Sequence, residues 1–353
     1  MRRFHFALLA LLLSLAAQPL LAATYYVGNC NAGGYGTIQA AVTAVPAGST
    51  IDVCPGTYPE QVIIAKALTL QGIVSSNSSQ AVIALPGGDL AITPSLLFGA
   101  LEAQVEISAG PVNITNITVD GDLGASICPT VYYVGIHYGT GSSGTVNEVE
   151  TRNQNCWPNA LGMFAENGAG AVQTVKIENS VVHDYSYVGI MTYSTQSPST
   201  LTTTISGNYV YGGGSADYAG IWAYHNTAGV ISSNTVSGST RGVVVNSSAV
   251  TISGNTVTDG SYGIDVQAAA SITSNRIFNT PTGIFLGVAG STIKSNTIAK
   301  ATISGVQMNC WAATVTGNTI NGVTTGLDYV PSAFAGANRF YNVATVRNRE
   351  NCP

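Results

Sequence analysis

The side chains that could carry out acid–base chemistry lie within one stretch of this chain. Asp184 stands next to His183, and Asp217 and His225 follow shortly after. Two carboxylates with a nearby imidazole are groups that glycoside hydrolysis and other acid–base reactions use. We therefore treat Asp184 and Asp217 as a candidate catalytic pair, with His183 or His225 assisting. The alternative is that both aspartates cap turns or face solvent, which is a common role for aspartate.

Side chains that could line a binding surface occupy the same stretch. All histidines after residue 23, and half of the aromatic residues after it, lie between residues 132 and 225. An aromatic ring offers a rigid, flat surface to the apolar face of a sugar ring. The candidate substrate-binding residues are His137, Phe164, Glu166, Tyr193, Trp222 and Tyr224. The alternative is that insertion loops fold back and bury these aromatics in a second, smaller core.

A paired repeat shows which elements must position these residues. A short β-prone stretch ending in Asn recurs with a period near 21 residues at Asn208, Asn234, Asn255, Asn275, Asn296, Asn318 and Asn338. Between these positions, a Gly followed by alternating apolar residues recurs at Gly220, Gly242, Gly263, Gly283, Gly305 and Gly326. A fixed period of this length predicts a solenoid, in which each coil buries its apolar face against its neighbours.

The alternation within each repeat predicts which side chains face outward. A coil of about 21 residues holds three short strands, and successive coils stack about 4.8 Å apart. We expect the asparagines to form an internal ladder of hydrogen bonds. The apolar residue after each glycine should point inward, so His137, Phe164, Met191 and Trp222 should point outward on consecutive coils. Tyr193 and Tyr224 should face the same way, two residues further along.

The coils between about residues 128 and 225 are longer than the others. The glycines Gly135, Gly162, Gly189 and Gly220 are separated by 27, 27 and 31 residues. Insertions on a solenoid form loops along its side and often build the binding face. This is the stretch that carries the candidate catalytic and binding residues.

The first residues have the features of a signal peptide, which we assign to residues 1–23. Arg2 and Arg3 precede an apolar run that is too short to cross a membrane, and small residues follow. Behind an export signal, six cysteines predict three disulfides, and proximity favours Cys30–Cys54, Cys128–Cys156 and Cys310–Cys352. The spacing of zinc ligands is absent. We expect a secreted or periplasmic protein.

The segment from Thr37 to Gly72 carries a family resemblance. TIQAAVTAVPAGSTIDVCPGTYPEQVIIAKALTLQG resembles the N-terminal cap and first coil of right-handed parallel β-helix proteins of the pectin-lyase-like superfamily. That group includes pectin methylesterases and periplasmic NosD-type proteins. With the Asn and Gly repeats, the resemblance covers nearly the whole chain after residue 23.

The resemblance implies an all-β fold, a single-stranded right-handed parallel β-helix with a short N-terminal capping helix. Residues 24–72 would form the cap and first coil, and residues 73–353 the remaining coils. The resemblance does not identify any catalytic residue in this chain, because three sets of family motifs are missing. These are GxxDFIFG of pectin methylesterases, RxPxxR of pectate lyases, and NTD, DD, GHG and RIK of polygalacturonases. This fold hosts many unrelated functions.

Two functions fit the sequence. The first is an exported protein that binds a polysaccharide or cell-surface glycan along its enlarged coils, with or without processing it. An enzymatic version would be a polysaccharide lyase, a glycoside hydrolase or an epimerase. The second is a non-catalytic surface or matrix protein with a structural or adhesive role, which the low share of charged residues, 8%, favours. A NosD-type metal accessory role is disfavoured because Met, His and Cys clusters are missing.

Charge and composition limit the kinds of partner and cofactor that we expect for this protein. The net charge of −5 and the lack of a basic block argue against nucleic acid. We expect a monomer without a metal or cofactor, with Ca²⁺ needed only if the protein is a lyase. The lyase version is weakened because we expect none of the bases in or near the enlarged coils, Arg152, Lys176 and Arg241, to fall on an outward strand position.

Overall fold

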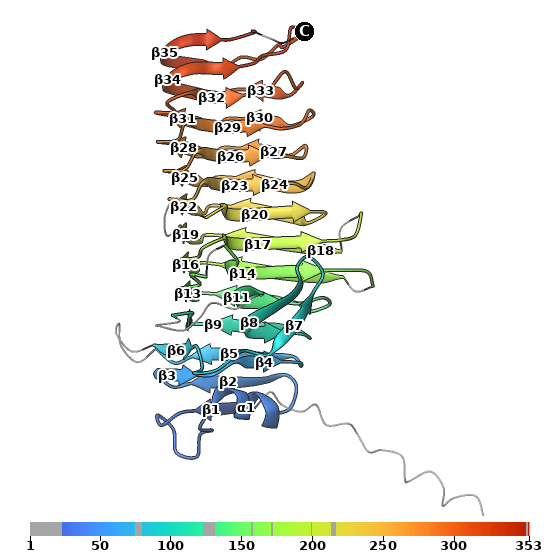
Figure 1. Cartoon of the computed structure of the whole chain (residues 1–353), viewed down its shortest axis with the longest axis vertical. Helices are drawn as coiled ribbons and strands as arrows, with labels where there is room; N and C mark the ends of the chain where they lie inside the picture. The colour runs from blue at the N-terminus through green and yellow to red at the C-terminus, as the bar shows by residue number, and fades with distance from the viewer. Residues whose placement is uncertain are drawn as a thin grey trace, which may run out of the picture.

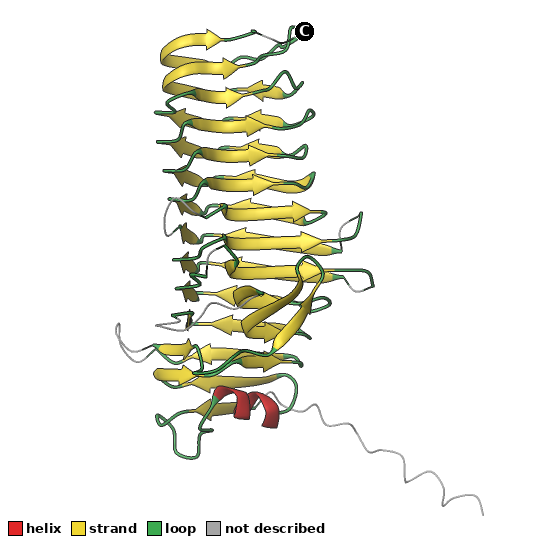
Figure 2. Cartoon of the chain, viewed as in Figure 1, coloured by secondary structure: helices red, strands yellow, loops and turns green. Residues whose placement is uncertain are grey.

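Parallel strands stacked in register make up more than half of the residues that the structure describes, and the one helix among those residues is short and lies at one end of the stack (Figures 1 and 2). The structure, a computed structural model, describes residues 23–74, 80–122, 131–156, 158–170, 172–198, 200–212, 217–350 and 352. The predicted signal peptide lies outside the described residues, apart from Ala23. No helix in the described ranges is long and apolar enough to cross a membrane.

The strands form a 12-stranded and a 23-stranded sheet, and the larger sheet consists of two series of parallel strands that are joined at β34 (Thr319–Asp328). We refer to the 12-stranded sheet as sheet 1 and to the two series as sheets 2 and 3, and a complete coil contributes one strand to each. Sheet 1 holds β1 (Thr24–Val27), β2 (Ser49–Val53), β5 (Leu68–Gly72), β9 (Val112–Thr115), β12 (Gly144–Asn147), β15 (Gln173–Glu178), β18 (Leu201–Ser206), β21 (Ala228–Ser232), β24 (Ala249–Ser253), β27 (Ser271–Thr273), β30 (Thr292–Lys294) and β33 (Thr314–Thr316). Sheet 2 holds β3 (Gly56–Pro59), β6 (Ala81–Ala84), β10 (Ile117–Asp120), β13 (Glu150–Arg152), β16 (Val181–His183), β19 (Tyr209–Tyr211), β22 (Thr235–Ser237), β25 (Thr256–Thr258), β28 (Arg276–Phe278) and β31 (Thr297–Ala299).

Sheet 3 carries the strands that contain the repeat glycines. It holds β4 (Val62–Ile64), β8 (Gly99–Ile107), β11 (Tyr132–Tyr138), β14 (Ala160–Asn167), β17 (Val188–Ser194), β20 (Ala219–His225), β23 (Arg241–Val245), β26 (Tyr262–Val266), β29 (Thr282–Leu286) and β32 (Ser304–Gln307). β34 (Thr319–Asp328) pairs with both β31 and β32, and β35 (Arg339–Arg347) pairs with β34. The all-β parallel fold predicted from the sequence is confirmed.

Apolar side chains from all three sheets meet inside the stack. Ile252 of sheet 1, Val257 of sheet 2 and Ile264 of sheet 3 are all buried in one continuous core cluster. The strands of sheet 3 lengthen in the enlarged coils, where β11, β17 and β20 each have 7 residues and β14 has 8. β23, β26 and β29 have 5 residues each. Part of the predicted insertion is therefore longer strand and not loop.

The predicted asparagine ladder is present and buried. The Oδ1 atom of Asn255 accepts hydrogen bonds from the backbone N–H and the side-chain amide of Asn234, both at 2.9 Å. The side-chain amide of Asn255 in turn donates to Oδ1 of Asn275 at 3.0 Å. The same bonds link the series from Asn208 to Asn338. These amides satisfy backbone groups at a buried turn, where an unpaired N–H would be costly.

The repeat glycines are required by close backbone approach between coils. A Cβ atom on Gly162 would lie 2.7 Å from the carbonyl oxygen of Gly189. A Cβ atom on Gly189 would lie 2.7 Å from the carbonyl oxygen of Gly220. Any larger residue would push neighbouring coils apart, so the Gly repeat and the Asn repeat both preserve the register.

The first coil is covered by the predicted helix, α1 (Ile38–Ala44). Thr37 caps its start by accepting a hydrogen bond from the Ala40 N–H, and the Glu60 carboxylate accepts from the N–H groups of Ile38 and Gln39 at 2.7 Å. The buried face of the helix covers the open end of the core.

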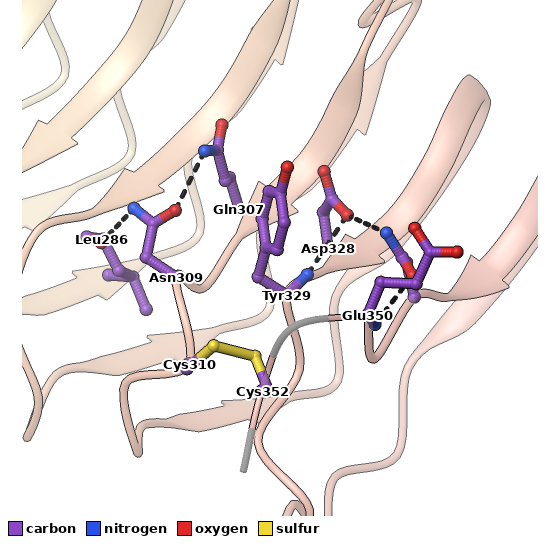
Figure 3. The surroundings of a disulfide bond; sticks show 9 residues. Leu286, Gln307, Asn309, Cys310, Asp328, Tyr329, Glu350 and Cys352 are labelled. Atoms are coloured by element: carbon purple, nitrogen blue, oxygen red, sulfur yellow. Dashed lines mark hydrogen bonds between the residues drawn. A yellow bond between two sulfur atoms is a disulfide. The ribbon is translucent and has the colours of Figure 1, made fainter.

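Two of the three predicted disulfides are confirmed. Cys30–Cys54 ties the loop after β1 to the end of β2, and Cys310–Cys352 ties the C-terminal segment to the loop after β32 (Figure 3). Cys128 lies outside the described residues, so its predicted pairing with Cys156 is not described.

An antiparallel hairpin interrupts the regular stack. β7 (Ile92–Ser95) pairs with the start of β8, and the hairpin rises across the front of the stack toward β14 (Figure 1). A single buried carboxylate holds its tip. Glu166 accepts hydrogen bonds from the Ser95 hydroxyl at 3.0 Å and from the backbone N–H groups of Leu96 and Leu97 at 3.0 and 3.2 Å.

Glu166 belongs to a buried row of three charged side chains. The Nδ1 atom of His137 lies 2.8 Å from Oε2 of Glu106, and its Nε2 atom lies 3.4 Å from Oε1 of Glu166. Burial alone would lower the pKa of His137, but its hydrogen bond with Glu106 and its charge interactions with both carboxylates raise the pKa to about 9. His137 is therefore a cation at neutral pH and bridges β8, β11 and β14 on sheet 3.

We predict that Asn255→Ala will destabilise the protein by about 3 kcal/mol, because it leaves the buried N–H of Asn234 without a partner and also removes the side-chain bonds. Asn321→Ala, at an exposed position of β34, should cost less than about 0.5 kcal/mol. Urea unfolding midpoints of the two variants test this. Equal shifts would contradict a structural role for the ladder.

We predict that stability will fall between pH 6.5 and about 9 because of His137. The folded-state pKa is raised above the unfolded value, so the stabilisation is complete below the unfolded pKa and is lost as pH rises through the folded pKa. The loss should be on the order of 3 kcal/mol. His137→Gln removes the titrating group, so its unfolding midpoint should depend less on pH over this range. Parallel pH curves for the two proteins would disprove the assignment.

Candidate functional site

The predicted outward row on sheet 3 exists in register. His137 pairs with Phe164, Phe164 with Met191, and Met191 with Trp222 on successive strands. Glu166, Tyr193 and Tyr224 form a second row two residues further along. The repeat therefore predicts which side chains are neighbours across coils.

The first of these rows is largely buried along its whole length, since Met191 has 1% and Trp222 9% of its surface exposed, whereas Tyr193 and Tyr224 of the second row are partly exposed. His137, Phe164 and Glu166 point outward from sheet 3, but each has at most 1% of its surface exposed. The Phe98 ring of the hairpin lies 5.4 Å from the Phe164 ring. The expectation of a second small core therefore holds at this end, and these three predicted binding residues do not face solvent. The cause is residues 92–107, whose antiparallel hairpin the sequence repeat did not predict.

Beyond the hairpin, the outer layer of this second core is a continuous set of aromatic rings. We call this set the aromatic strip, and it consists of Tyr132, Tyr187, Tyr193, Tyr218, Trp222, Tyr224 and His225. Its tyrosines are partly exposed and His225 is exposed. The rings lie on the open side of β11, β17 and β20 and in the turns that lead into β17 and β20.

Contacts with Asn246, Tyr218 and Tyr224 fix the orientation of Trp222, which is 9% exposed. Its indole N–H donates a 2.7 Å hydrogen bond to Oδ1 of Asn246, and its ring centroid lies 4.6 Å from that of Tyr218 and 4.7 Å from that of Tyr224. Tyr224 stacks on Tyr193 at 5.6 Å. The strip is a rigid surface, because rings in mutual contact lose little further freedom when a ligand binds.

The hydroxyls of Tyr187, Tyr193 and Tyr218 in the strip stay protonated at neutral pH. Burial, followed by the neighbouring hydroxyls of Tyr132, Tyr218 and Tyr224, raises the pKa of Tyr187 to about 12. Burial likewise raises the pKa values of Tyr193 and Tyr218. Each hydroxyl can therefore both donate and accept a hydrogen bond toward a ligand.

An arginine closes one end of the strip. The guanidinium of Arg241 lies 4.5 Å from the centroid of the Tyr218 ring, and its Nε–H donates to Asp265 at 2.9 Å. The expectation that Arg241 and Arg152 lie off the outward positions was wrong. Arg241 begins β23 and packs on the strip, while Arg152 points outward from β13 of sheet 2, which the glycine-based register did not cover.

His183 and Asp184 lie on sheet 2, not beside the aromatic strip. Nδ1 of His183 lies 2.6 Å from Oδ2 of Asp184, and Nε2 lies 3.2 Å from Oε1 of Glu150. The His183 ring stacks on Tyr211 with centroids 4.6 Å apart. The imidazole of His183, a candidate acid–base group, thus lies between the carboxylates of Asp184 and Glu150. The sequence pattern did not suggest Glu150.

Arg152 extends this charged group along sheet 2. Its guanidinium lies 3.1 Å from Glu150 and 2.9 Å from Asp120. Burial would raise the pKa of Asp120, but hydrogen bonds from Asn153, Arg152 and the Asp122 N–H lower it. We call Asp120, Glu150, Arg152, His183, Asp184 and Tyr211 the charged row.

Asp217 has a different environment from Asp184. The two occupy corresponding turns of successive coils, after β16 and before β20, but Asp217 is only 3% exposed. Its carboxylate accepts a hydrogen bond from the Thr240 N–H at 3.3 Å, and burial raises its pKa. No hydrogen bond between described residues joins the two aspartates. The contacts of Asp217 are those of an aspartate that caps a turn, which is the alternative role considered from the sequence. The catalytic role of Asp217 stays a prediction.

His225 completes the set of predicted catalytic residues. It ends β20 on sheet 3, with its ring 5.7 Å from Tyr193, whereas His183 ends β16 on sheet 2. The structure therefore distributes the four candidates over two faces and a buried turn. Within the described ranges, no three His, Cys, Asp or Glu side chains are grouped to hold a metal ion.

Sequence reasoning missed several residues of both groups. Tyr187 and Tyr218 each stand two residues before a repeat glycine, a regularity that could have placed them beside the strip. Glu150 and Arg152 carry no such signal, because their strand β13 has only 3 residues and lies between repeats of unequal length.

Comparisons with known proteins define the family. The family model of the right-handed beta helix region matches residues 103–273 and 199–343. No curated protein sequence matches the chain.

Solved structures share the fold at low sequence identity. The GH136 lacto-N-biosidase from Eubacterium ramulus superposes with a TM-score of 0.63 and 11% identity, over 92% of this chain and 68% of that chain. PfbA, a surface adhesin of Streptococcus pneumoniae, superposes with a TM-score of 0.53 and 13% identity, over 89% of this chain and 88% of that chain. The chain belongs to the right-handed β-helix family, in agreement with the resemblance of its N-terminal coil.

Proposed function

We propose that this protein binds a glycan along the aromatic strip of sheet 3. The observation that carries the proposal is the unbroken chain of ring contacts from Tyr132 through Tyr187, Tyr218 and Trp222 to Tyr224. The tyrosines of this chain of contacts are partly exposed, and a contiguous apolar surface that solvent can reach is typical of an interaction site.

The strip suits sugar rings in shape and in chemistry. Stacked rings present flat apolar surface, and the protonated hydroxyls of Tyr187, Tyr193 and Tyr218 supply hydrogen bonds at its margin. Arg241, a cation at one end of the strip, is already paired with Asp265. The hairpin contributes indirectly, because Phe98 stacks on Tyr132 at 3.8 Å and fixes that end of the strip.

Binding without bond cleavage is the form of the proposal that the geometry favours. The strip holds aromatic side chains and one imidazole, whereas the carboxylates Asp184 and Asp217 lie on sheet 2 and in a buried turn. An adhesive or matrix role therefore has more support than a lyase, hydrolase or epimerase. The two disulfides are typical of proteins outside the cytoplasm, so we propose an extracellular or cell-surface glycan.

We predict that Trp222→Ala combined with Tyr224→Ala will weaken retention on the glycan at least about tenfold, which corresponds to about 1.4 kcal/mol. The measurement is affinity electrophoresis through gels that contain neutral or uronate polysaccharides. Trp311→Ala combined with Tyr341→Ala is the matched control, because these aromatics are 44% and 54% exposed outside the strip. If the strip variant is too unstable, Tyr193→Ala replaces it. Unchanged retention of the strip variants, or an equal loss in the control, would refute the proposal.

We predict that incubation of the protein with each polysaccharide that retains it will release no unsaturated products and no new reducing ends. Absorbance of unsaturated uronates and a reducing-end assay measure the two outcomes. Unsaturated products would identify a lyase, and reducing ends alone a hydrolase. Either result would replace the binding role with an enzymatic one.

A further inference from the structure

The last strand of the stack, β35, has a free edge. Among the pairings between described strands, β35 takes part only in the one with β34. Figure 1 shows β35 as the outermost strand at the C-terminal end of the solenoid. All of its residues except Phe340 and Val343 are exposed. The opposite end of the stack differs, because α1 covers it.

The free edge presents backbone groups that can pair with a further strand. The N–H of Asn348 donates to the carbonyl oxygen of Leu327 in β34. Backbone groups of successive residues in a parallel sheet alternate between the two sides of a strand, so those of Thr345 and Arg347 point away from β34. Proteins often protect such edges with proline or lysine, and β35 contains neither. The edge is therefore open to pairing with another chain.

The residues after β35 turn away from this edge and leave the end of the core incompletely covered. Cys352 is joined to Cys310, which lies in the loop after β32, two coils before β35 (Figure 3). Phe340 and Val343 are in register with the buried Ile320 and Val323 of β34 and pack against the same core, but they are only partly buried. One more strand on β35 would bury them.

Positive charge is concentrated around the same edge. Arg339 and Arg347 begin and end β35, Arg349 follows it, and all three are exposed. They are three of the six arginines after residue 23, in a chain whose net charge is −5. No ion pair between described residues engages them, whereas Arg152 on sheet 2 is paired with two carboxylates. Glu350 offsets only part of this charge, so the edge favours an acidic partner.

We propose that the free edge of β35 binds an extended acidic segment of another protein, which adds to the sheet as one more strand. The backbone of the segment pairs with Thr345 and Arg347, and its apolar side chains cover Phe340 and Val343. Its carboxylates lie against the arginines. A second copy of this chain fits less well, because an end-to-end contact would bring two sets of three arginines together. The site does not depend on the aromatic strip, and either could exist without the other.

The test measures fluorescence anisotropy with the full protein and a labelled peptide that carries two Glu residues on each side of an alternating Thr-Val core. The proposal predicts that this peptide binds and that its affinity falls as salt is added. One control peptide has Lys in place of Glu, and the other has N-methyl groups on all core nitrogens, which prevents strand pairing. Both controls should bind at least about tenfold more weakly. This comparison requires no variant of the protein.

Variants of the protein then locate the site. Thr345→Pro removes an N–H group from the free edge, and Thr345→Ala, its control, keeps that group. Arg339→Gln combined with Arg349→Gln removes two positive charges, and its control is Arg276→Gln, at an exposed arginine of β28. We expect Thr345→Pro and the double arginine variant each to lower the affinity at least about tenfold, and the controls to change it less than about twofold. Thermal unfolding confirms that each variant is folded. If Thr345→Pro does not fold, the N-methylated peptide tests the same point.

Three results would overturn the proposal. The first is that the acidic peptide does not bind. The second is that the N-methylated peptide, or polygalacturonate, binds as tightly as the acidic peptide, which would indicate a site for anions in general. The third is self-association of the protein that Thr345→Pro abolishes, without binding of the peptide, which would assign the edge to a second copy of this chain.

Discussion

Hydrogen bonds between buried asparagines hold each coil in register with the next, and the rest of the structure depends on that register. Asn255, Asn275 and Asn296 each accept hydrogen bonds from the backbone N–H and the side-chain amide of the asparagine in the preceding coil. The repeat glycines let the coils approach closely, since a Cβ on Gly162 would collide with the next carbonyl. Because the stacking is fixed, any residue type repeated at one position becomes a continuous row on the surface.

The same register explains why two different surfaces arise on one solenoid. On sheet 3 the rows bring together aromatic side chains such as Trp222 and Tyr224, and on sheet 2 they bring together charged ones such as Arg152 and His183. The hairpin modifies this pattern by covering one end of sheet 3. Its anchor is electrostatic, because Glu166 binds the hairpin tip and His137⁺ at the same time.

The sequence was sufficient for the fold and for part of the candidate site. The period of the Asn and Gly repeats identified the solenoid, and alternation placed Trp222, Tyr193 and Tyr224 on one face. It could not show that His137 and Phe164 are buried, because the residues that cover them, 92–107, follow no repeat. It also could not separate His183 from His225, since assignment to a sheet depends on turn lengths that vary between coils.

The account depends most on the claim that the open aromatic strip, and not the regular coils, is where the glycan lies. A crystal structure of the protein with an oligosaccharide of the polysaccharide that retains it most strongly tests this directly. The account predicts sugar rings stacked over Trp222, Tyr224 and Tyr193. Sugar bound only along the regular coils, between residues 249 and 347, with the strip bare would contradict it.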